Sequence, residues 1–227
     1  MEETAQQVID GADRADLFVP LETYLSAGVH IGMTQRTKAM SKYIYKVRND
    51  KLAFIDVRKI DEQIEMAAKL LAKYDAKDII VVSRKKIGHK AVMQFAKILG
   101  SIAVPSRFMP GTLTNPYQKG YIEPKIMVVT DPFADKQAVV EAFNANIPIV
   151  AICDTYNSVQ YIDLVCPLNN KGRKSVALFY WILAREVMKL QGKIKGDAEF
   201  KYTVEDFEMS MDEAAEDMDE EEDAVEA

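Results

Sequence analysis

The stretch PKIMVVTDPFADKQAVVEAFNANIPIVAICDT, residues 124–155, decides the fold of this chain. It holds an apolar, β-branched run at 126–129, then a segment whose apolar residues recur three to four positions apart, then a second apolar run at 149–153. The two runs are typical of strands and the middle segment of an amphipathic helix, whose start Asp131 or Asp135 could cap. Strand, helix and buried strand within about 30 residues make one right-handed βαβ unit, so the sequence predicts an α/β domain with a parallel sheet covered by helices.

Outward from this unit, apolar runs and helical periodicity alternate along most of the chain. They predict strands at 52–57, 78–83, 102–104 and 161–165. They also predict four helices: a short one that begins at Pro20, one at 58–74, one that ends at Gly100 and one at 175–190. The last helix is apolar nearly all round from Val176 to Ala184, so we expect it to be the most buried helix, with Trp181 in the core.

The charge of the chain is divided between acidic ends and a basic middle. The 227 residues carry a formal net charge of −6, and 48% of them are hydrophobic, which is enough for a sizeable core. Residues 17–204 contain 28 Lys and Arg against 17 Asp and Glu, a formal charge of +11, whereas 205–227 contain thirteen acids and no Lys or Arg. A basic body of this kind attracts phosphate polyanions.

The cations of the middle gather in three groups. The first group has Tyr43 and Tyr45 between its members. This mixture suits binding of phosphates by the cations and stacking of bases on the rings. The alternative is a solvated loop or edge strand whose tyrosines pack inward. The second follows the strand at 78–83, at the carboxyl end where open α/β sheets bind ligands, unless it is a solubility fringe. The third is a polar lead-in to the last helix. The groups are Arg36, Lys38, Lys42, Lys46 and Arg48; Arg84, Lys85 and Lys86; and Lys171, Arg173 and Lys174.

The loop at 107–116, RFMPGTLTNP, has the composition of an ordered loop of fixed shape. Its Thr112, Thr114 and Asn115 could bind phosphate or sugar hydroxyls, or satisfy their own backbone instead. Arg107 and Asn115 are the candidates for fixing the orientation of a bound nucleic acid.

Other residues indicate no metal or redox chemistry. Cys153 and Cys166 form no CxxC pair and are typical of reduced cytoplasmic thiols. A lone His30 with no nucleophile or acid nearby in sequence is expected to be structural. We therefore expect no metal and no cofactor.

The two ends of the chain are expected to differ from the body. We expect a disordered acidic segment at 1–16, one α/β domain at 17–201 and a disordered acidic tail at 202–227, which serves solubility, binds a partner or shields the basic body. The sequence shows no charged-then-apolar leader and no apolar run near the ~18 residues of a membrane span, so we expect a cytoplasmic protein that contacts no membrane.

Enzyme motifs are missing from the sequence. No GxGxxG follows a strand, no GxSxG occurs, and the residues 172–175, GRKS, lack the order of a phosphate-binding loop. We therefore expect no catalysis and no small-molecule substrate. A nucleotide- or flavin-binding α/β module remains an alternative on fold grounds alone, and an adaptor that works through its acidic arm is a second one.

Two stretches carry a resemblance to a known family. The residues 24–32, YLSAGVHIG, and 124–148, PKIMVVTDPFADKQAVVEAFNANIP, match its signatures. The chain resembles the universal small-subunit ribosomal protein family S-two, in its archaeal and eukaryotic, laminin-receptor-like branch. The loop at 107–115 and the residues 167–172, PLNNKG, are also similar, and the resemblance covers roughly 17–190.

The resemblance implies a flavodoxin-like parallel sheet with helices on both faces, a three-layer α/β/α architecture. It also implies a structural component of the small ribosomal subunit, bound to ribosomal RNA between head and body and to neighbouring ribosomal proteins, with no catalytic residues. Bacterial members insert a long helical hairpin before the strand at 126, where this chain has only 116–125. Together the residues and the resemblance predict a ribonucleoprotein component whose Lys and Arg contact RNA phosphates.

Overall fold

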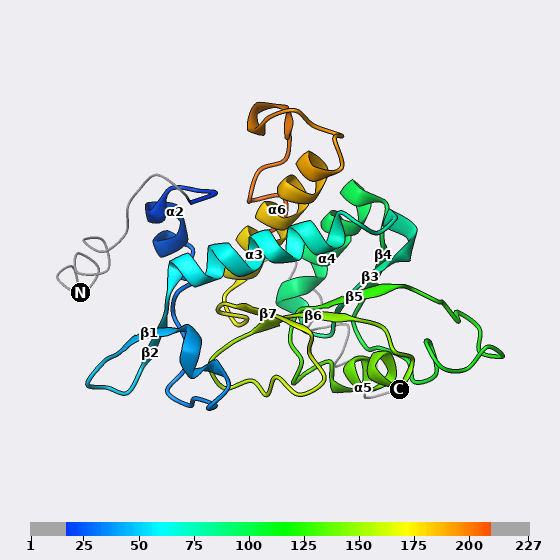
Figure 1. The fold of residues 1–227 in the computed structure, drawn as a ribbon, viewed down its shortest axis with the longest axis horizontal. Coiled ribbons are helices and arrows are strands. Elements are labelled where there is room, and N and C mark those ends of the chain that lie inside the picture. The colour runs from blue at the N-terminus through cyan, green and yellow to red at the C-terminus, as the bar shows by residue number, and fades with distance from the viewer. Residues whose placement is uncertain (1–16, 210–227) are drawn as a thin grey trace, which may run out of the picture.

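Five parallel strands form the central sheet of the computed structural model, which describes residues 17–209 (Figure 1). Their order is β4-β3-β5-β6-β7, which is the flavodoxin-like order of a doubly wound sheet. The predicted three-layer α/β/α fold is therefore confirmed. The strands are β3 (Ile79–Ser83), β4 (Ile102–Pro105), β5 (Ile126–Val129), β6 (Ile149–Cys153) and β7 (Leu164–Pro167).

Helices cover both faces of this sheet (Figure 1). On one face α6 packs against both α3 and α4, and on the other face α5 lies alone below the strands in the view of Figure 1. The most buried helix is α6, as its all-round apolar sequence predicts. The helices are α3 (Val57–Leu71), α4 (Lys86–Leu99), α5 (Lys136–Asn144) and α6 (Arg173–Leu190).

The βαβ unit that the sequence predicts is β5-α5-β6. Both strands are buried along their whole length and pair in parallel, with Val128 opposite Val150. The side chain of Asp135, the N-cap residue of α5, makes no capping bond to the helix, whereas Oδ1 of Asp131 accepts a hydrogen bond from the backbone N–H of Phe133 at 3.0 Å. Asp131 thus stabilises the turn before the helix, whereas the side chain of Asp135 accepts a hydrogen bond from the backbone N–H of Arg84.

A small antiparallel hairpin stands beside the sheet. It pairs β1 (Ile44–Val47) with β2 (Ala53–Ile55), the strand predicted at 52–57, and is preceded by α2 (Leu21–Ser26) and the 3₁₀ turn η1 (Met40–Tyr43). Tyr43 is buried and Tyr45 is exposed, so only one of the two tyrosines packs inward. Two further 3₁₀ turns are η2 (Ala76–Asp78) and η3 (Asp197–Glu199).

Two sequence predictions about the end of the fold are wrong. The last strand is Leu164–Pro167 rather than 161–165, because Tyr161 has a positive φ of 67° and Oδ2 of Asp163 accepts from the N–H of Ile149 at 2.8 Å. Trp181 is only partly buried, because its Nε1 donates to the carbonyl of Tyr202 at the surface of α6, at 2.8 Å.

The packed part of the chain extends past residue 201, where a tail was expected to begin. Phe207 is 0% exposed and Met209 is also buried, and Nη1 of Arg173 donates to the carbonyl of Met209 at 3.2 Å. The segment 202–209 therefore lies along α6, with one end near Trp181 and the other near Arg173. The expectations for 1–16 and 210–227 lie outside the described residues.

Candidate nucleic-acid interface

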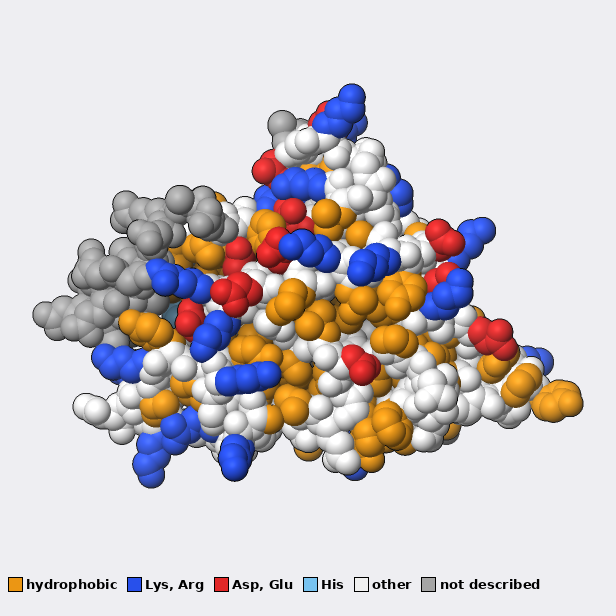
Figure 2. All heavy atoms as spheres, in the orientation of Figure 1, with side chains coloured by type: hydrophobic (Ala, Val, Ile, Leu, Met, Phe, Trp, Pro, Cys, Tyr) orange, Lys and Arg blue, Asp and Glu red, His pale blue; other side chains and the backbone are white. Residues whose placement is uncertain are grey.

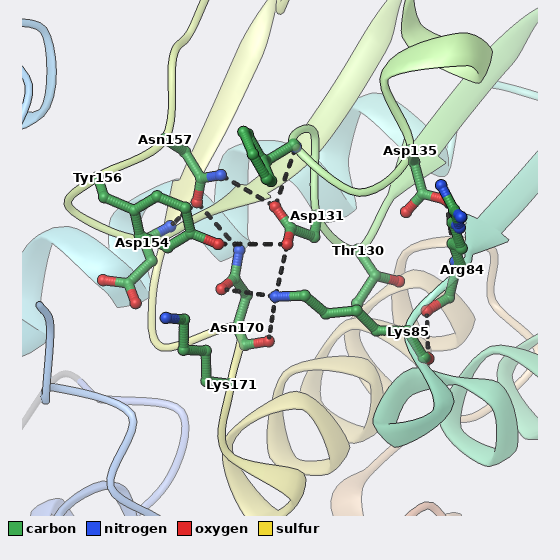
Figure 3. A network of polar contacts seen from close by, with 12 residues as sticks. Arg84, Lys85, Thr130, Asp131, Asp135, Asp154, Tyr156, Asn157, Asn170 and Lys171 are labelled. Atoms are coloured by element: carbon green, nitrogen blue, oxygen red, sulfur yellow. Dashed lines mark hydrogen bonds and ion pairs between the residues drawn. The ribbon is translucent and has the colours of Figure 1, made fainter. Parts of the chain in front are cut away.

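A buried polar network lies where β3, β5, β6 and β7 end (Figure 3). Nζ of Lys85 lies 2.5 Å from Oδ2 of Asp131, whose side chain is fully buried. Oδ1 of Asp131 accepts from Nδ2 of Asn157 at 2.9 Å, and Oδ1 of Asn157 accepts from Nδ2 of Asn170 at 3.0 Å. Because each residue follows a different strand, the network ties four loops together at the carboxyl edge of the sheet.

Burial raises the pKa of two further carboxyl groups at this edge. The pKa of Asp135 rises to about 7, mainly because burial disfavours its charge and partly because Asp131 is near, although the N–H of Arg84 donates to its Oδ1 at 2.9 Å. Burial also raises the pKa of Asp154, which accepts from the N–H of Thr155. These acids face the protein interior rather than the surface.

The segment at 33–37 is attached to the same edge through Thr155, which follows β6. Oγ1 of Thr155 accepts from the N–H of Met33 at 2.9 Å, and the carbonyl of Thr155 accepts from the N–H of Thr37 at 2.9 Å. Gly32 permits this approach, since a Cβ there would lie 2.6 Å from Cγ2 of Thr155. The start of the first cation group, Arg36 and Lys38, is thereby brought to the carboxyl edge although it is far away in sequence.

Most of the predicted cations lie on the surface, and several lie at this one edge. Arg84 directly follows β3, Arg107 comes two residues after β4, and Lys171 comes four residues after β7. Carboxyl ends of parallel strands meet at the same edge, so these three side chains share it with the segment at 33–37. The predicted cations that are exposed are Arg36, Lys38, Lys42, Lys46, Arg48, Arg84, Arg107, Lys171 and Lys174.

Figure 2 shows a group of Lys and Arg side chains over β1, β2 and the segment before them, at the lower left of the face drawn. Within this group Nε of Arg48 lies 3.6 Å from Oδ2 of Asp50, and Nζ of Lys42 lies 4.8 Å from the ring centroid of Tyr43. An exposed ion pair of this kind is weak, so it competes little with a phosphate.

Three of the predicted cations are less accessible. Lys85 belongs to the buried network, and Arg173 donates to Met209. Lys86 is partly exposed at the start of α4. Lys85 therefore has a structural partner that the sequence alone did not identify.

The loop at 107–116 is held against α5. Both carboxylate oxygens of Glu141 accept from this loop, one from the N–H of Gly111 at 2.8 Å and one from the N–H of Leu113 at 3.3 Å. Asn115 is exposed, and its Oδ1 accepts from the N–H of Tyr117 at 3.1 Å. This asparagine satisfies its own backbone, one of the two roles the sequence left open, with its amide nitrogen at the surface.

The ribosomal protein S2 family model matches residues 24–120 and 117–189, most of the described body. This chain belongs to the ribosomal protein S2 family. It is 50% identical, over 196 residues, to the small ribosomal subunit protein uS2 of Saccharolobus solfataricus, with 86% of this chain and 85% of that protein covered. The uS2 proteins of Thermoplasma volcanium and Thermoplasma acidophilum are 47% and 46% identical, with 98% of each covered. The family predicted from the sequence is thus confirmed.

In this S2 family member the ring of His30 stacks on that of Phe54 with centroids 5.6 Å apart, and burial lowers the pKa of His30. Among residues 17–209 no group of His, Cys, Asp or Glu is arranged to hold a metal ion, and no described helix is long and apolar enough to cross a membrane.

Sequence reasoning missed two features of the S2 fold at the carboxyl edge. One is the network of Asp131, Asn157 and Asn170, for which the available signal was a polar residue two to four positions after the end of each of β5, β6 and β7. The other is the exposed ring of Phe133, which lies 6.3 Å from the ring of Tyr156. An aromatic residue just before a helix is usually expected to pack in the core, so nothing in the sequence indicated that Phe133 is exposed.

Proposed function

We propose that this chain is a structural, non-catalytic component of the small ribosomal subunit, in the cytoplasm. Its membership of the ribosomal protein S2 family and its likeness to archaeal uS2 proteins support the proposal. The finer part concerns ribosomal RNA, which we infer to lie against the carboxyl edge of the sheet. The observation that carries this part is the meeting at one edge of cations from four separate segments, at Arg36, Arg84, Arg107 and Lys171.

The physical basis of this contact is a basic body with fixed loops. Residues 17–204 carry a formal charge of +11, which attracts RNA phosphates irrespective of base sequence. The buried network fixes the loops that carry the cations, so little ordering is needed on binding. Phosphate contacts supply affinity, and the polar groups of the loop at 107–116 help to set orientation.

We rank the candidate RNA contacts by exposure and by place. Those at the carboxyl edge come first, those in the hairpin and the turn before it come second together with Asn115, and the less accessible ones come last. The order is Arg36, Lys38, Arg84, Arg107, Lys171 and Lys174; then Lys42, Arg48 and Asn115; then Lys86, Arg173 and Lys85.

The position on the subunit is part of the proposal. The chain would sit between head and body and contact neighbouring ribosomal proteins, as its family resemblance implies. The segment at 116–125 is too short for the helical hairpin of bacterial members, so partners that bind through that hairpin are not expected here.

The test compares two pairs of substitutions in the full chain. The variant Arg36→Gln/Lys38→Gln is measured against Lys77→Gln/Lys97→Gln, two exposed cations at the opposite end of β3 and in the last turn of α4. Affinity for deproteinised small-subunit RNA is recorded over a range of salt. Each lost phosphate contact should reduce the slope of log K against log salt by about 0.7 to 0.9.

The expected result is a shallower slope and lower incorporation into subunits for the first pair alone. Equal slopes for both variants and the unaltered protein, with full incorporation, would contradict RNA binding at this edge. Bound flavin absorbance in the purified protein would instead favour the nucleotide-binding alternative.

A further inference from the structure

The carboxyl edge carries an exposed aromatic pair as well as cations. Phe133 is 77% exposed, and its ring lies 6.3 Å from that of Tyr156 with an angle of 70° between the planes. Such an edge-to-face contact leaves most of the Phe133 ring open to solvent. A ring this exposed contributes little to the stability of the free protein. Folding stability therefore does not explain why a large apolar side chain lies in solvent at this position.

This pair is held in a fixed position by the buried network. The N–H of Phe133 donates to Oδ1 of Asp131 at 3.0 Å, and the hydroxyl of Tyr156 donates to Oδ2 of the same residue at 3.3 Å. Asp131 is itself paired with Lys85. The ring of Tyr156, through its hydroxyl, and the backbone of Phe133 are therefore both attached to one buried carboxylate, which limits the conformational entropy lost if a ligand contacts the pair.

The charge around the pair favours an anionic ligand. Nζ of Lys171 lies 4.9 Å from the ring centroid of Tyr156, so a cation lies directly beside the aromatic pair. Of the two nearby acids, Asp131 is paired with Lys85, and burial raises the pKa of Asp154 and so disfavours its charge. An aromatic face next to a cation is the arrangement by which proteins bind unpaired nucleotides.

A second exposed aromatic pair provides the contrast. Phe143, which is 51% exposed, lies 4.2 Å from Tyr161 beside a pocket of about 320 Å³ at the amino end of β6. The residues that line this pocket include Asp163 but no Lys or Arg. Both pairs expose apolar surface, but only the pair at the carboxyl edge combines it with a cation.

We propose that Phe133 and Tyr156, with Lys171 beside them, form a stacking site for an unpaired base of RNA. The inference rests on the proposed function, because it assigns a base-binding site to the surface that contacts phosphates. Stacking differs from phosphate contact because it requires an RNA base that is not paired and stacked within an RNA helix.

The test uses the full chain with three substitutions. Phe133→Ala removes the ring, Phe133→Trp keeps an aromatic face, and Phe143→Ala is the matched control at the other pair. Affinity is measured for deproteinised small-subunit RNA, for single-stranded oligoadenylate and for an RNA duplex of equal length. Phe133→Ala should weaken binding of the first two about 5- to 150-fold and leave duplex binding unchanged.

Phe133→Trp should retain that affinity, and its new indole should lose fluorescence when oligoadenylate is added. The measurement is made in a Trp181→Phe background, since Trp181 is the single tryptophan of the chain. Phe143→Ala should bind all three RNAs as the unaltered protein does. Quenching on stacking is a signal that a purely structural role of Phe133 would not produce.

The remaining outcomes separate this inference from the proposed function. If Phe133→Ala leaves RNA affinity unchanged while Arg36→Gln/Lys38→Gln reduces it, the stacking site is overturned and the phosphate surface stands. If Phe133→Ala reduces only incorporation into subunits, the ring contacts a protein and the inference is wrong. If none of these substitutions alters RNA binding, both proposals fail.

Discussion

Asp131 is the residue on which the carboxyl edge depends. Its two oxygens receive bonds from the loops after β3, β5 and β6, through Lys85, Phe133 and Asn157. A fully buried carboxylate is tolerated only when it is paired and hydrogen-bonded. The residue thus positions both the cations and the aromatic pair that we assign to RNA.

Removing the partner of Asp131 should be costly. Lys85→Met leaves the buried carboxylate without its cation, so we expect the free energy of unfolding to fall by about 3 to 5 kcal/mol. Urea denaturation measures it. The control Lys97→Met, at an exposed lysine in the last turn of α4, the helix that Lys85 precedes, should change it by less than about 0.5 kcal/mol. An equally small effect of Lys85→Met would show that the pair contributes nothing.

Asp135 should make stability depend on pH. Its pKa of about 7 in the folded chain is above that of an exposed aspartate, so the folded state binds the proton more tightly. Its contribution is therefore full below about pH 4, where the aspartate is also protonated in the unfolded chain, and is lost as pH rises from there to about 7. Asp135→Asn keeps an oxygen for the N–H of Arg84 and cannot ionise. We expect the variant to come closest to the unaltered protein near pH 4 and to exceed it near pH 8, in urea denaturation at each pH. The same difference at both would contradict the assignment.

At the scale of elements, α6 organises one face of the fold. It packs against α3 and α4, and the segment 202–209 lies along its outer side. This segment has little regular structure, yet Phe207 is fully buried. The segment is attached by the buried ring of Phe207 and by two hydrogen bonds, in which the side chains of Trp181 and Arg173 donate to its backbone carbonyls.

The anchor can be tested by truncating its side chain. Phe207→Ala leaves a cavity against the core, so the free energy of unfolding should fall by about 3 to 5 kcal/mol. Thermal or urea denaturation measures the loss. Deletion of 210–227 keeps the anchor and should leave stability unchanged. A neutral Phe207→Ala would mean that the body ends near 201, as the sequence suggested.

At the scale of the whole molecule, charge is separated along the chain. The described body is basic, whereas residues 210–227 contain ten acids and no Lys or Arg. The chain leaves the described body at Met209, which is bonded to Arg173 at the start of α6. The described body therefore ends close to a cation of the third group.

Deleting 210–227 should strengthen binding to RNA. The deletion changes the formal net charge from −6 to +4. Long-range attraction is screened by salt, so affinity for small-subunit RNA should rise about tenfold near 50 mM salt and much less near 300 mM. Filter binding at both concentrations measures it. A gain that does not depend on salt would point to a cause other than charge.

Much of the fold could be predicted because burial leaves a local record in the sequence. The apolar runs at 126–129 and 149–153 coincide with β5 and β6, and the nearly all-round apolar sequence of α6 predicted its burial. Predictions failed where a distant partner decided the outcome. Trp181 is held at the surface by Tyr202, and Phe207 is buried within a segment that composition suggested to be a tail.

The sequence by itself determined the α/β class, the βαβ unit, the family and the separation of charge, since all of these follow from local periodicity, motif spelling and composition. Only the tertiary structure decided which cations share an edge, that Lys85 is paired inside, and that Phe133 faces solvent. The reason is that parallel strands bring together residues far apart in the chain, and a side chain's partner across such a distance leaves no periodic signal.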